Sequence, residues 1–419
     1  GVAAFMSVGL CTFLVAQFDP AAEPERDRLN AATWLALGLA VLSKGLIGVV
    51  LPGTTLIVYM LWQRDLGILG RVGLGRGIAL LALICLPWFV AMSRIHPDFF
   101  AYFFVRQHFT RFLSAVDHRS QPFWFFLPVV FGGLFPWTSL LIVSGRNHRA
   151  THSIGSARRF LWIWIGVIFL FFSASHSKLP FYILPLMPAL ALVLGEAAAS
   201  MPSTVLARRL FATAAMGAVG IGVALLLPVG KHFSADANTY RHARLGIATG
   251  LALITATTAA SGCMLRKQQR EPRQAQQARG LAIHALALAA LVAWQLMLLS
   301  LQGLENGYSS APVARIVEAA LPAYADVYTV QTSLRGLPFY LGRPVTLVDA
   351  QPDDIAPTFA SRPEGYVPTL AEFEQRWRAG GPAVAVTTAQ GLAHLRAAGL
   401  PFRELGTGGA HIVISRRAL

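Results

Sequence analysis

Over the first 300 residues, long apolar runs are separated by short polar connections. A helix that crosses the hydrocarbon core of a bilayer needs about 20 mostly apolar residues. Ten segments approach that length, and the pattern predicts a membrane span for each, although the second and third are short. The predicted spans cover residues 1–18, 31–43, 46–62, 77–94, 123–143, 160–175, 180–199, 210–229, 244–265 and 280–300.

The second and third predicted spans meet at Ser43-Lys44-Gly45, so a single long helix over both is the alternative. Positive charge in the connections tests this, because short cytoplasmic loops are enriched in Lys and Arg. If the chain turns at Lys44, the two alternating sets of connections carry sixteen and nine Lys and Arg residues. The charge asymmetry favours ten spans and predicts that the chain beyond residue 300 lies outside the cytoplasm.

The last part of the chain, residues 301–419, has a different pattern. Short β-rich stretches alternate there with helical stretches, which predicts a small α/β domain. The β-rich stretches are 325–330, 338–348, 383–387 and 411–415, and the helical ones are 369–378 and 391–398. About 119 residues can bury a core of their own. We therefore divide the chain into a multi-span membrane domain (1–300) and an extracytoplasmic domain (301–419).

Composition agrees with this division. A content of 55% hydrophobic and 13% charged residues excludes an ordinary soluble enzyme. The net charge of +15 would favour nucleic acid binding in a soluble chain, but residues 301–419 hold ten Arg and ten acidic residues, so the excess lies among the predicted spans. We expect no nucleic acid partner. The three cysteines fall within spans and indicate neither disulfides nor a metal site.

Two groups of polar residues at predicted outer helix ends are candidates for function, because ionisable groups near a membrane are costly. Lys44 lies at a turn, where its ammonium can bind a phosphate; a lysine that reaches lipid headgroups is the alternative. Lys178 and Tyr182 lie in a proline-rich segment, 176–188, whose irregular backbone is tolerated at membrane depth when it is buried in protein or lines a cavity. The alternative for Tyr182 is an interfacial anchor at a kinked helix end.

The third group lies in the outer loop 94–121, which is rich in aromatic residues and contains Arg106, His108 and Arg111. His108 and Arg111 are three residues apart and share a helix face, as in a helix that lies at the membrane surface with cations toward lipid phosphates. A metal at His108 needs further ligands that spacing does not supply, and a solvated histidine is the alternative. Carboxylates outside the cytoplasm form no recognisable acid/base pair among residues 1–300.

Several motifs of these regions resemble the bacterial aminoarabinose lipid A transferases and their relatives, which are GT-C glycosyltransferases alongside the protein O-mannosyltransferases. The motifs are Leu42-Ser43-Lys44-Gly45, Pro87-Trp88, Gln107-His108-Phe109-Thr110-Arg111-Phe112, Pro122-Phe123-Trp124, Pro136-Trp137 and Ser177-Lys178-Leu179-Pro180-Phe181-Tyr182-Ile183-Leu184-Pro185. The resemblance covers about residues 30–190. It implies a membrane glycosyltransferase that moves a sugar from a polyprenyl phosphate to lipid A or a related glycolipid at the periplasmic face of the bacterial inner membrane.

The resemblance also implies roles for single residues. Lys44, Arg111 and Tyr182 match positions of the donor cavity, and Lys178 matches the lysine of the family's proline-rich motif. The pattern itself adds Arg106 to the candidate substrate-binding residues. His108 matches a histidine that can share a divalent metal with an acidic residue. The family's acidic catalytic residues and about three further spans precede the point that matches Gly1, so we interpret the chain, which opens inside an apolar run, as a fragment.

Two other functions stay open at this point. One is a protein O-mannosyltransferase-type activity with a protein acceptor. The other is a transporter or flippase of anionic lipid-linked substrates, because a cationic cavity at a proline-broken helix also suits substrate passage. A glycosyltransferase predicts three partners: a polyprenyl-phosphate sugar donor, a lipid A-like or protein acceptor, and membrane lipids.

Overall fold

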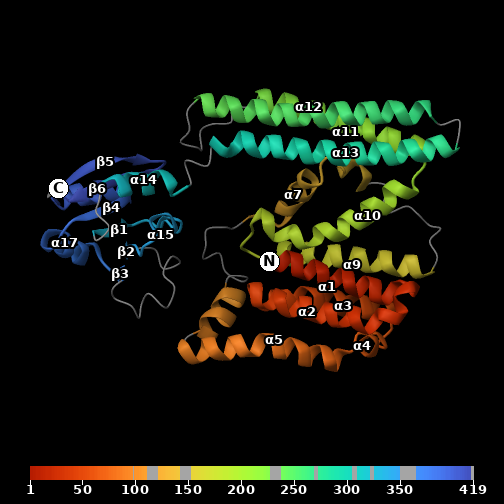
Figure 1. Cartoon of the computed structure of the whole chain (residues 1–419), viewed down its shortest axis with the longest axis horizontal. Helices are drawn as coiled ribbons and strands as arrows, with labels where there is room; N and C mark the ends of the chain where they lie inside the picture. Colours follow the sequence, from red (N-terminus) through yellow and green to blue (C-terminus); the bar gives the residue numbers. More distant parts are fainter. Residues whose placement is uncertain are drawn as a thin grey trace. The chain divides into compact units, whose positions relative to one another are not determined.

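A computed structural model gives the fold of the chain (Figure 1). It describes residues 1–97, 99–110, 121–141, 152–226, 237–268, 272–303, 309–320, 325–349 and 365–416. The chain divides into two compact units, one of residues Gly1–Thr213 and Ala260–Ile283 and the other of Ala214–Ala259 and His284–Leu419. Three long helices, α11 (Ser203–Leu226), α12 (Ala237–Lys267) and α13 (Pro272–Leu301), contribute to both units.

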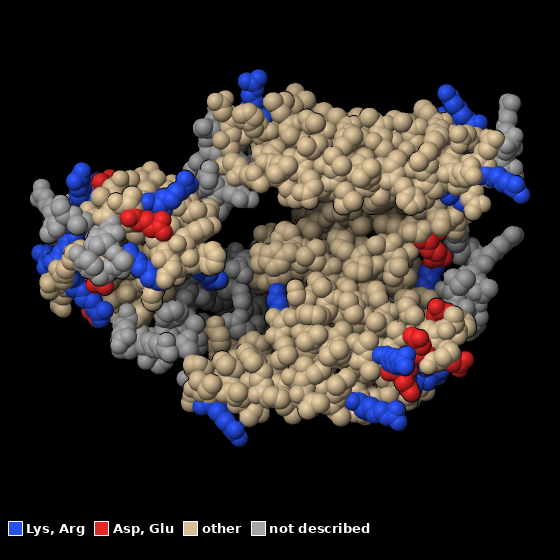
Figure 2. Space-filling view, viewed as in Figure 1, with Lys and Arg blue, Asp and Glu red and all other residues tan. Residues whose placement is uncertain are grey.

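The apolar runs are helical, as the sequence predicts, and the chain is a multi-pass membrane protein. In the described part of the chain, six helices are long and apolar enough to cross a membrane: α5 (Leu74–Ile95), α9 (His152–Ala174), the segment Pro180–Ser200, α11, α12 and α13. α1 (Val2–Phe18) and α2 (Arg26–Lys44) pass that test together but bend by 113° between them, and α3 (Ile47–Gln63) is a shorter apolar helix. In Figure 2 the sides of α5, α12 and α13 are almost bare of charged residues.

Small residues let the first helices approach closely. Gly9 of α1 lies against Leu37 of α2, where an added Cβ would be 3.2 Å from the leucine Cδ2. On the other side of α2, the indole of Trp34 covers Gly77 of α5 and donates a hydrogen bond of 3.0 Å to the Val72 carbonyl. Without a hydrophobic driving force between helices in lipid, such close packing is a main source of helix association.

The predicted span 123–143 is not a continuous helix. It consists of η3 (Phe123–Phe125), α7 (Phe126–Gly133), a turn and η4 (Thr138–Leu140), with a cis peptide bond between Phe135 and Pro136 in the turn. The Thr213 hydroxyl of α11 donates to the Pro136 carbonyl at 3.1 Å, which satisfies a group that the missing helix leaves without a partner. Proline at this position prevents helical hydrogen bonding, so the expectation of one straight span was wrong.

The C-terminal part of the second unit is the α/β structure that the alternating pattern predicts. Its six-stranded sheet has the order β3-β2-β1-β4-β6-β5, with β3, β2, β1 and β4 parallel and the last two antiparallel to their neighbours. The strands are β1 (Asp326–Val330), β2 (Thr346–Val348), β3 (Tyr366–Val367), β4 (Ala383–Thr388), β5 (Phe402–Gly408) and β6 (His411–Arg416).

Helices cover both faces of the sheet, since alternate strand residues point to opposite sides. α14 (Ala311–Ala320) and α15 (Leu337–Leu341) pack on the face of Val327, Val384 and Val386. α17 (Leu370–Ala379) and α18 (Ala389–Ala397) pack on the other face, where Phe373, Trp377 and Leu395 meet Tyr328 and Ala385. The predicted strand over 338–348 was wrong in its first half, because a proline at the start of α15 favours a helical turn there.

Candidate functional site

Lys44 lies at the tip of a helical hairpin. Gly45 ends α2 in a positive-φ conformation (φ 78°), which a residue with a side chain rarely adopts, and its N–H donates back to the Val41 carbonyl at 2.7 Å. α3 then packs so closely on α2 that a Cβ on Gly48 would lie 2.5 Å from the carbonyl carbon of Ala40. The chain therefore turns at Lys44, as the charge pattern predicts, and leaves this side chain exposed.

The hairpin tip meets the proline-rich segment in space. The Lys44 ammonium lies 4.9 Å from the centre of the Tyr182 ring, which is a cation–π contact. A cation–π contact is worth about 0.5–2 kcal/mol. The same ring packs on Phe172 of α9, with the ring centres 5.5 Å apart. The fold thus brings together two of the predicted site residues from distant parts of the sequence.

Lys178 is a buried cation in the non-helical connection between α9 and η5 (Pro180–Leu186). Its side chain is only 5% exposed, and its ammonium donates to the Gln121 carbonyl at 3.0 Å and to the Ser175 carbonyl. Burial lowers the pKa of this ammonium from its usual value. An ammonium has three donors, and these two bonds, both to described residues, use two of them. The contacts also join the start of the 121–141 segment to the proline-rich turn.

Proline fixes the backbone around Tyr182. Pro180 occupies the first turn of η5, and the Pro185 carbonyl accepts a 3.0 Å hydrogen bond from the indole of Trp164 in α9. Ile183 and Pro185 are buried, whereas Phe181 and Leu184 are exposed. The turn is therefore anchored to α9 on one side, and this anchoring sets the direction of the Tyr182 ring. The irregular backbone predicted from the prolines is confirmed.

The remaining predicted residues are not placed at side-chain level. Arg106 and His108 belong to a π-helical segment, Ala101–Thr110, but their side chains lie outside the described part of the structure, and Arg111 lies outside the described residues altogether. The start of this segment packs its aromatic rings on α5, with Phe99 and Phe103 each within 6.3 Å of the Phe89 ring centre.

A metal site cannot be completed from the described residues. Among them, no group of three or more His, Cys, Asp and Glu side chains could hold an ion. A tightly bound divalent cation usually has three or more protein ligands, and His108 by itself supplies one. The metal at His108 stays a prediction.

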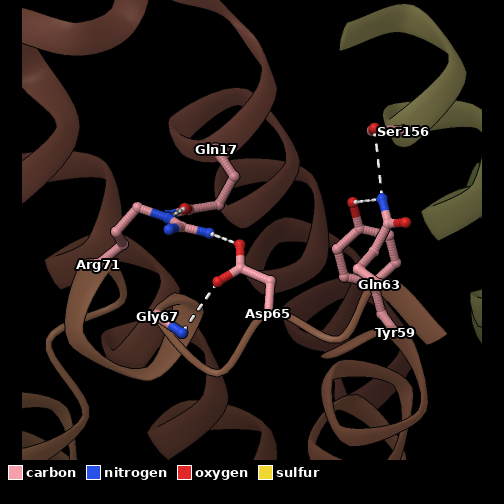
Figure 3. Close-up of polar contacts among 7 residues, drawn as sticks. All are labelled: Gln17, Tyr59, Gln63, Asp65, Gly67, Arg71 and Ser156. Atoms are coloured by element: carbon pink, nitrogen blue, oxygen red, sulfur yellow. Dashed lines mark hydrogen bonds and ion pairs between the residues drawn. The ribbon is translucent and has the colours of Figure 1, made fainter. Parts of the chain in front are cut away.

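A polar cavity, which the sequence did not suggest, lies at the other ends of the same helices (Figure 3). It has a volume of about 410 Å³, and its wall includes Gln17, Asp65 and Arg71. Arg71 forms a 2.6 Å ion pair with Asp65 and donates to the Gln17 amide oxygen at 3.4 Å. In addition, the Gln63 amide donates to the Tyr59 hydroxyl at 2.9 Å. These contacts connect α1, α3 and the following loop, so we assign them to packing.

Three comparisons relate the chain to known proteins. A family model described as the aminoarabinose transferase C-terminal domain matches residues 313–416. The chain is 36% identical over 174 residues to an undecaprenyl phosphate-alpha-4-amino-4-deoxy-L-arabinose arabinosyl transferase of Pseudomonas fluorescens, and 38% identical over 175 residues to one of Sodalis glossinidius. Each alignment covers 41% of this chain, but only 30% and 31% of those relatives. The matched part thus spans about a third of the relatives' own length.

Solved structures match over the whole chain. The crystal structure of ArnT from Cupriavidus metallidurans bound to undecaprenyl phosphate superposes with a TM-score of 0.88 and 29% identity, covering 100% of this chain and 74% of that one. Its apo form matches with a TM-score of 0.86 and 28% identity. The helical part and the C-terminal sheet thus both match one known architecture. The chain is therefore similar, over its whole fold and over its C-terminal domain, to the aminoarabinose lipid A transferases.

Proposed function

We propose that the protein is a glycosyltransferase that moves 4-amino-4-deoxy-L-arabinose from undecaprenyl phosphate to lipid A. Two facts support the donor: the names of the curated relatives, and the likeness to a structure that holds undecaprenyl phosphate. The observation that carries the proposal is the approach of the Lys44 ammonium to Tyr182, 4.9 Å from the ring centre, at the tip of the α2–α3 hairpin.

In the proposed reaction the bond between the sugar and the lipid phosphate breaks, and the phosphate leaves with an added negative charge. A preorganised cation near that oxygen stabilises the transition state more than the ground state. Lys44 is suited to this role because its side chain is exposed and the Tyr182 ring holds it in place. Lys178 fixes the turn that carries Tyr182 through two hydrogen bonds, and its positive charge attracts the donor phosphate. Arg106 and Arg111 complete the proposed cationic site.

A carboxylate must remove the proton from the acceptor hydroxyl. We also propose that the protein lies in the bacterial inner membrane, with residues 1–300 as the membrane domain and residues 301–419 in the periplasm. The sixteen Lys and Arg residues on the opposite set of connections support this orientation.

The test compares Lys44→Ala with Lys267→Ala in the full-length protein. Lys267 is also an exposed lysine at the end of a membrane helix, α12, but it belongs to the proposed cytoplasmic side. We expect Lys44→Ala to lower donor binding and to reduce transfer on the order of 100-fold or more, as for loss of one charge-stabilising group. Lys267→Ala should match the wild type. Wild-type turnover by Lys44→Ala would contradict the assignment.

The same assay separates a transferase from a flippase. In detergent there are no two compartments, so a flippase has no measurable reaction, whereas a transferase forms aminoarabinose-modified lipid A that mass spectrometry detects. Absence of product from the purified full-length protein, with donor binding intact, would favour transport of the lipid-linked sugar. Modification of a peptide acceptor in place of lipid A would favour the protein O-glycosylation alternative.

A further inference from the structure

The α/β part of the chain carries two strongly exposed aromatic residues. Phe339 and Tyr340 are 84% and 47% exposed, and among the described residues from 309 to 416 they are the two large hydrophobic side chains on the surface. Their rings pack edge to face with centres 5.6 Å apart. Pro338 and Arg335 beside them are also exposed. Soluble surfaces rarely keep such side chains together without a partner. We call these four residues the aromatic patch.

The local fold presents the patch outward. α15 is a single helical turn that begins after Gly336 and ends at Gly342, whose φ of 60° reverses the chain. Leu337 is fully buried against the sheet and holds the turn in place, while Phe339 and Tyr340 stay exposed. The exposure is thus a property of a well-packed turn and does not come from a loose end of the chain.

The patch also lies close to the point where the α/β part is attached to the membrane helices. A Cβ on Gly336 would lie 3.1 Å from the Ser310 hydroxyl, which places the start of the turn against Ser310. Ser310 comes only nine residues after Leu301, the last residue of α13. Nine residues span at most about 32 Å, so the chain keeps the patch within reach of the bilayer surface.

We propose that the aromatic patch is a membrane anchor that inserts Phe339 and Tyr340 into the interface of a bilayer with anionic lipids. Aromatic rings are favoured at the headgroup level, because the apolar ring enters the acyl region while a tyrosine hydroxyl stays hydrated. Arg335 beside the rings complements the negative charge of phosphatidylglycerol or cardiolipin. A protein partner is a poorer fit, because two rings and a proline are small beside the roughly 800 Å² per partner of a stable interface.

The anchor would hold the α/β part at the membrane surface near α13. This inference uses the membrane location of the helices and the geometry of α15, and it is independent of which reaction the protein catalyses. A catalytic failure of the Lys44 variant and a failure of the anchor are therefore distinguishable results.

The experiment measures lipid contact directly in the full-length protein in nanodiscs. After replacement of the native cysteines by serine, a bimane fluorophore is attached through Pro338→Cys, which leaves both rings in place. The matched control carries the same label through Gln375→Cys on α17, in the helical layer on the opposite face of the sheet. Lipids with a doxyl group on the acyl chain quench a fluorophore that lies at the membrane interface.

We expect doxyl lipids to quench the label at position 338 at least about twofold more than the label at position 375, as for a residue seated in the headgroup and acyl boundary. Phe339→Ser should reduce that difference, and so should Arg335→Glu or removal of phosphatidylglycerol. Equal quenching at the two positions would overturn the proposal. Two other results would also overturn it, because a protein surface would then cover the patch. In the first, the label at position 338 is shielded from water but is not quenched by doxyl lipids. In the second, it is shielded only in discs that hold two copies of the chain.

Discussion

The close approach of α2 and α3 gives a sharp test of the hairpin that carries Lys44. A Cβ added at Gly48 would lie 2.5 Å from the carbonyl carbon of Ala40, 2.6 Å from the Val41 nitrogen and 2.8 Å from the Ala40 oxygen. All three are backbone atoms, which cannot move aside as a side chain can. Ordinary contact begins at 3.4 Å, so Gly48→Ala requires the two helices to separate by about 0.9 Å.

Such a separation has a cost and a functional consequence. Overpacking of a tight contact costs about 1–3 kcal/mol, and we expect the midpoint of thermal unfolding in detergent to fall accordingly. The displaced hairpin tip would also move Lys44 relative to Tyr182. In an active site a shift of about 1 Å can cost on the order of 100-fold in rate, so aminoarabinose transfer should drop more than stability does.

Gly53→Ala on the same helix is the matched control. Nothing lies within 4 Å of a Cβ at Gly53, and alanine is a better helix former than glycine by about 0.5–1 kcal/mol. This variant should be as stable as the wild type or slightly more stable, with unchanged transfer. If Gly48→Ala behaved like Gly53→Ala in both measurements, the two helices could not be packed as closely as the structure has them.

Two further outcomes follow from buried groups. Lys178→Met removes the donor of two backbone hydrogen bonds, to Gln121 and Ser175, and we expect a loss of about 2 kcal/mol, seen as a lower unfolding midpoint; a variant as stable as the wild type would show that the ammonium is not bound there. In the α/β part, burial lowers the pKa of His411, so the unfolded chain binds the proton more readily and stability is lost as the pH falls below about 6.5. Hydrogen exchange of the β6 amides measures this stability, and His411→Gln should make their protection less dependent on pH. In the wild type the His411 ring nitrogen Nε2 lies 3.3 Å from the Thr332 hydroxyl. An unchanged pH dependence in the variant would rule out His411 as its source.

The sequence by itself determined the class of the protein and most of its elements. Runs of apolar residues are poorly soluble in water, so their length predicts helices in lipid, and short β-rich stretches that alternate with helical ones predict the α/β domain. Lys44 was expected at a turn because only a turn there puts most of the Lys and Arg residues of the connections on one side of the membrane. The structure has Gly45 with positive φ in that place. The break at Pro180 to Pro185 was likewise visible, since proline cannot continue the helical hydrogen bonds.

Irregular helices and short strands were not predicted from the sequence. The predicted span 123–143 is broken, because the turn around Pro136 depends on a hydrogen bond from Thr213, far away in the sequence. The strands β3 and β5 were missed: β3 is only two residues long, and the exposed and half-buried residues of β5 give no clean alternation. Short or half-exposed strands are stabilised by their neighbours, and a local pattern does not contain those neighbours.

Only the tertiary structure decided how the candidate residues meet. Sequence spacing names Lys44 and Tyr182 as separate candidates, and the packing of α2, α3 and α9 places the ammonium over the ring. The structure also shows that the Lys178 ammonium donates two hydrogen bonds to backbone carbonyls, which no sequence motif reveals. The physical reason is the same in each case: composition and periodicity report how a residue interacts with its solvent and its own helix, whereas a site is made of contacts between segments whose approach depends on the packing of all the residues between them.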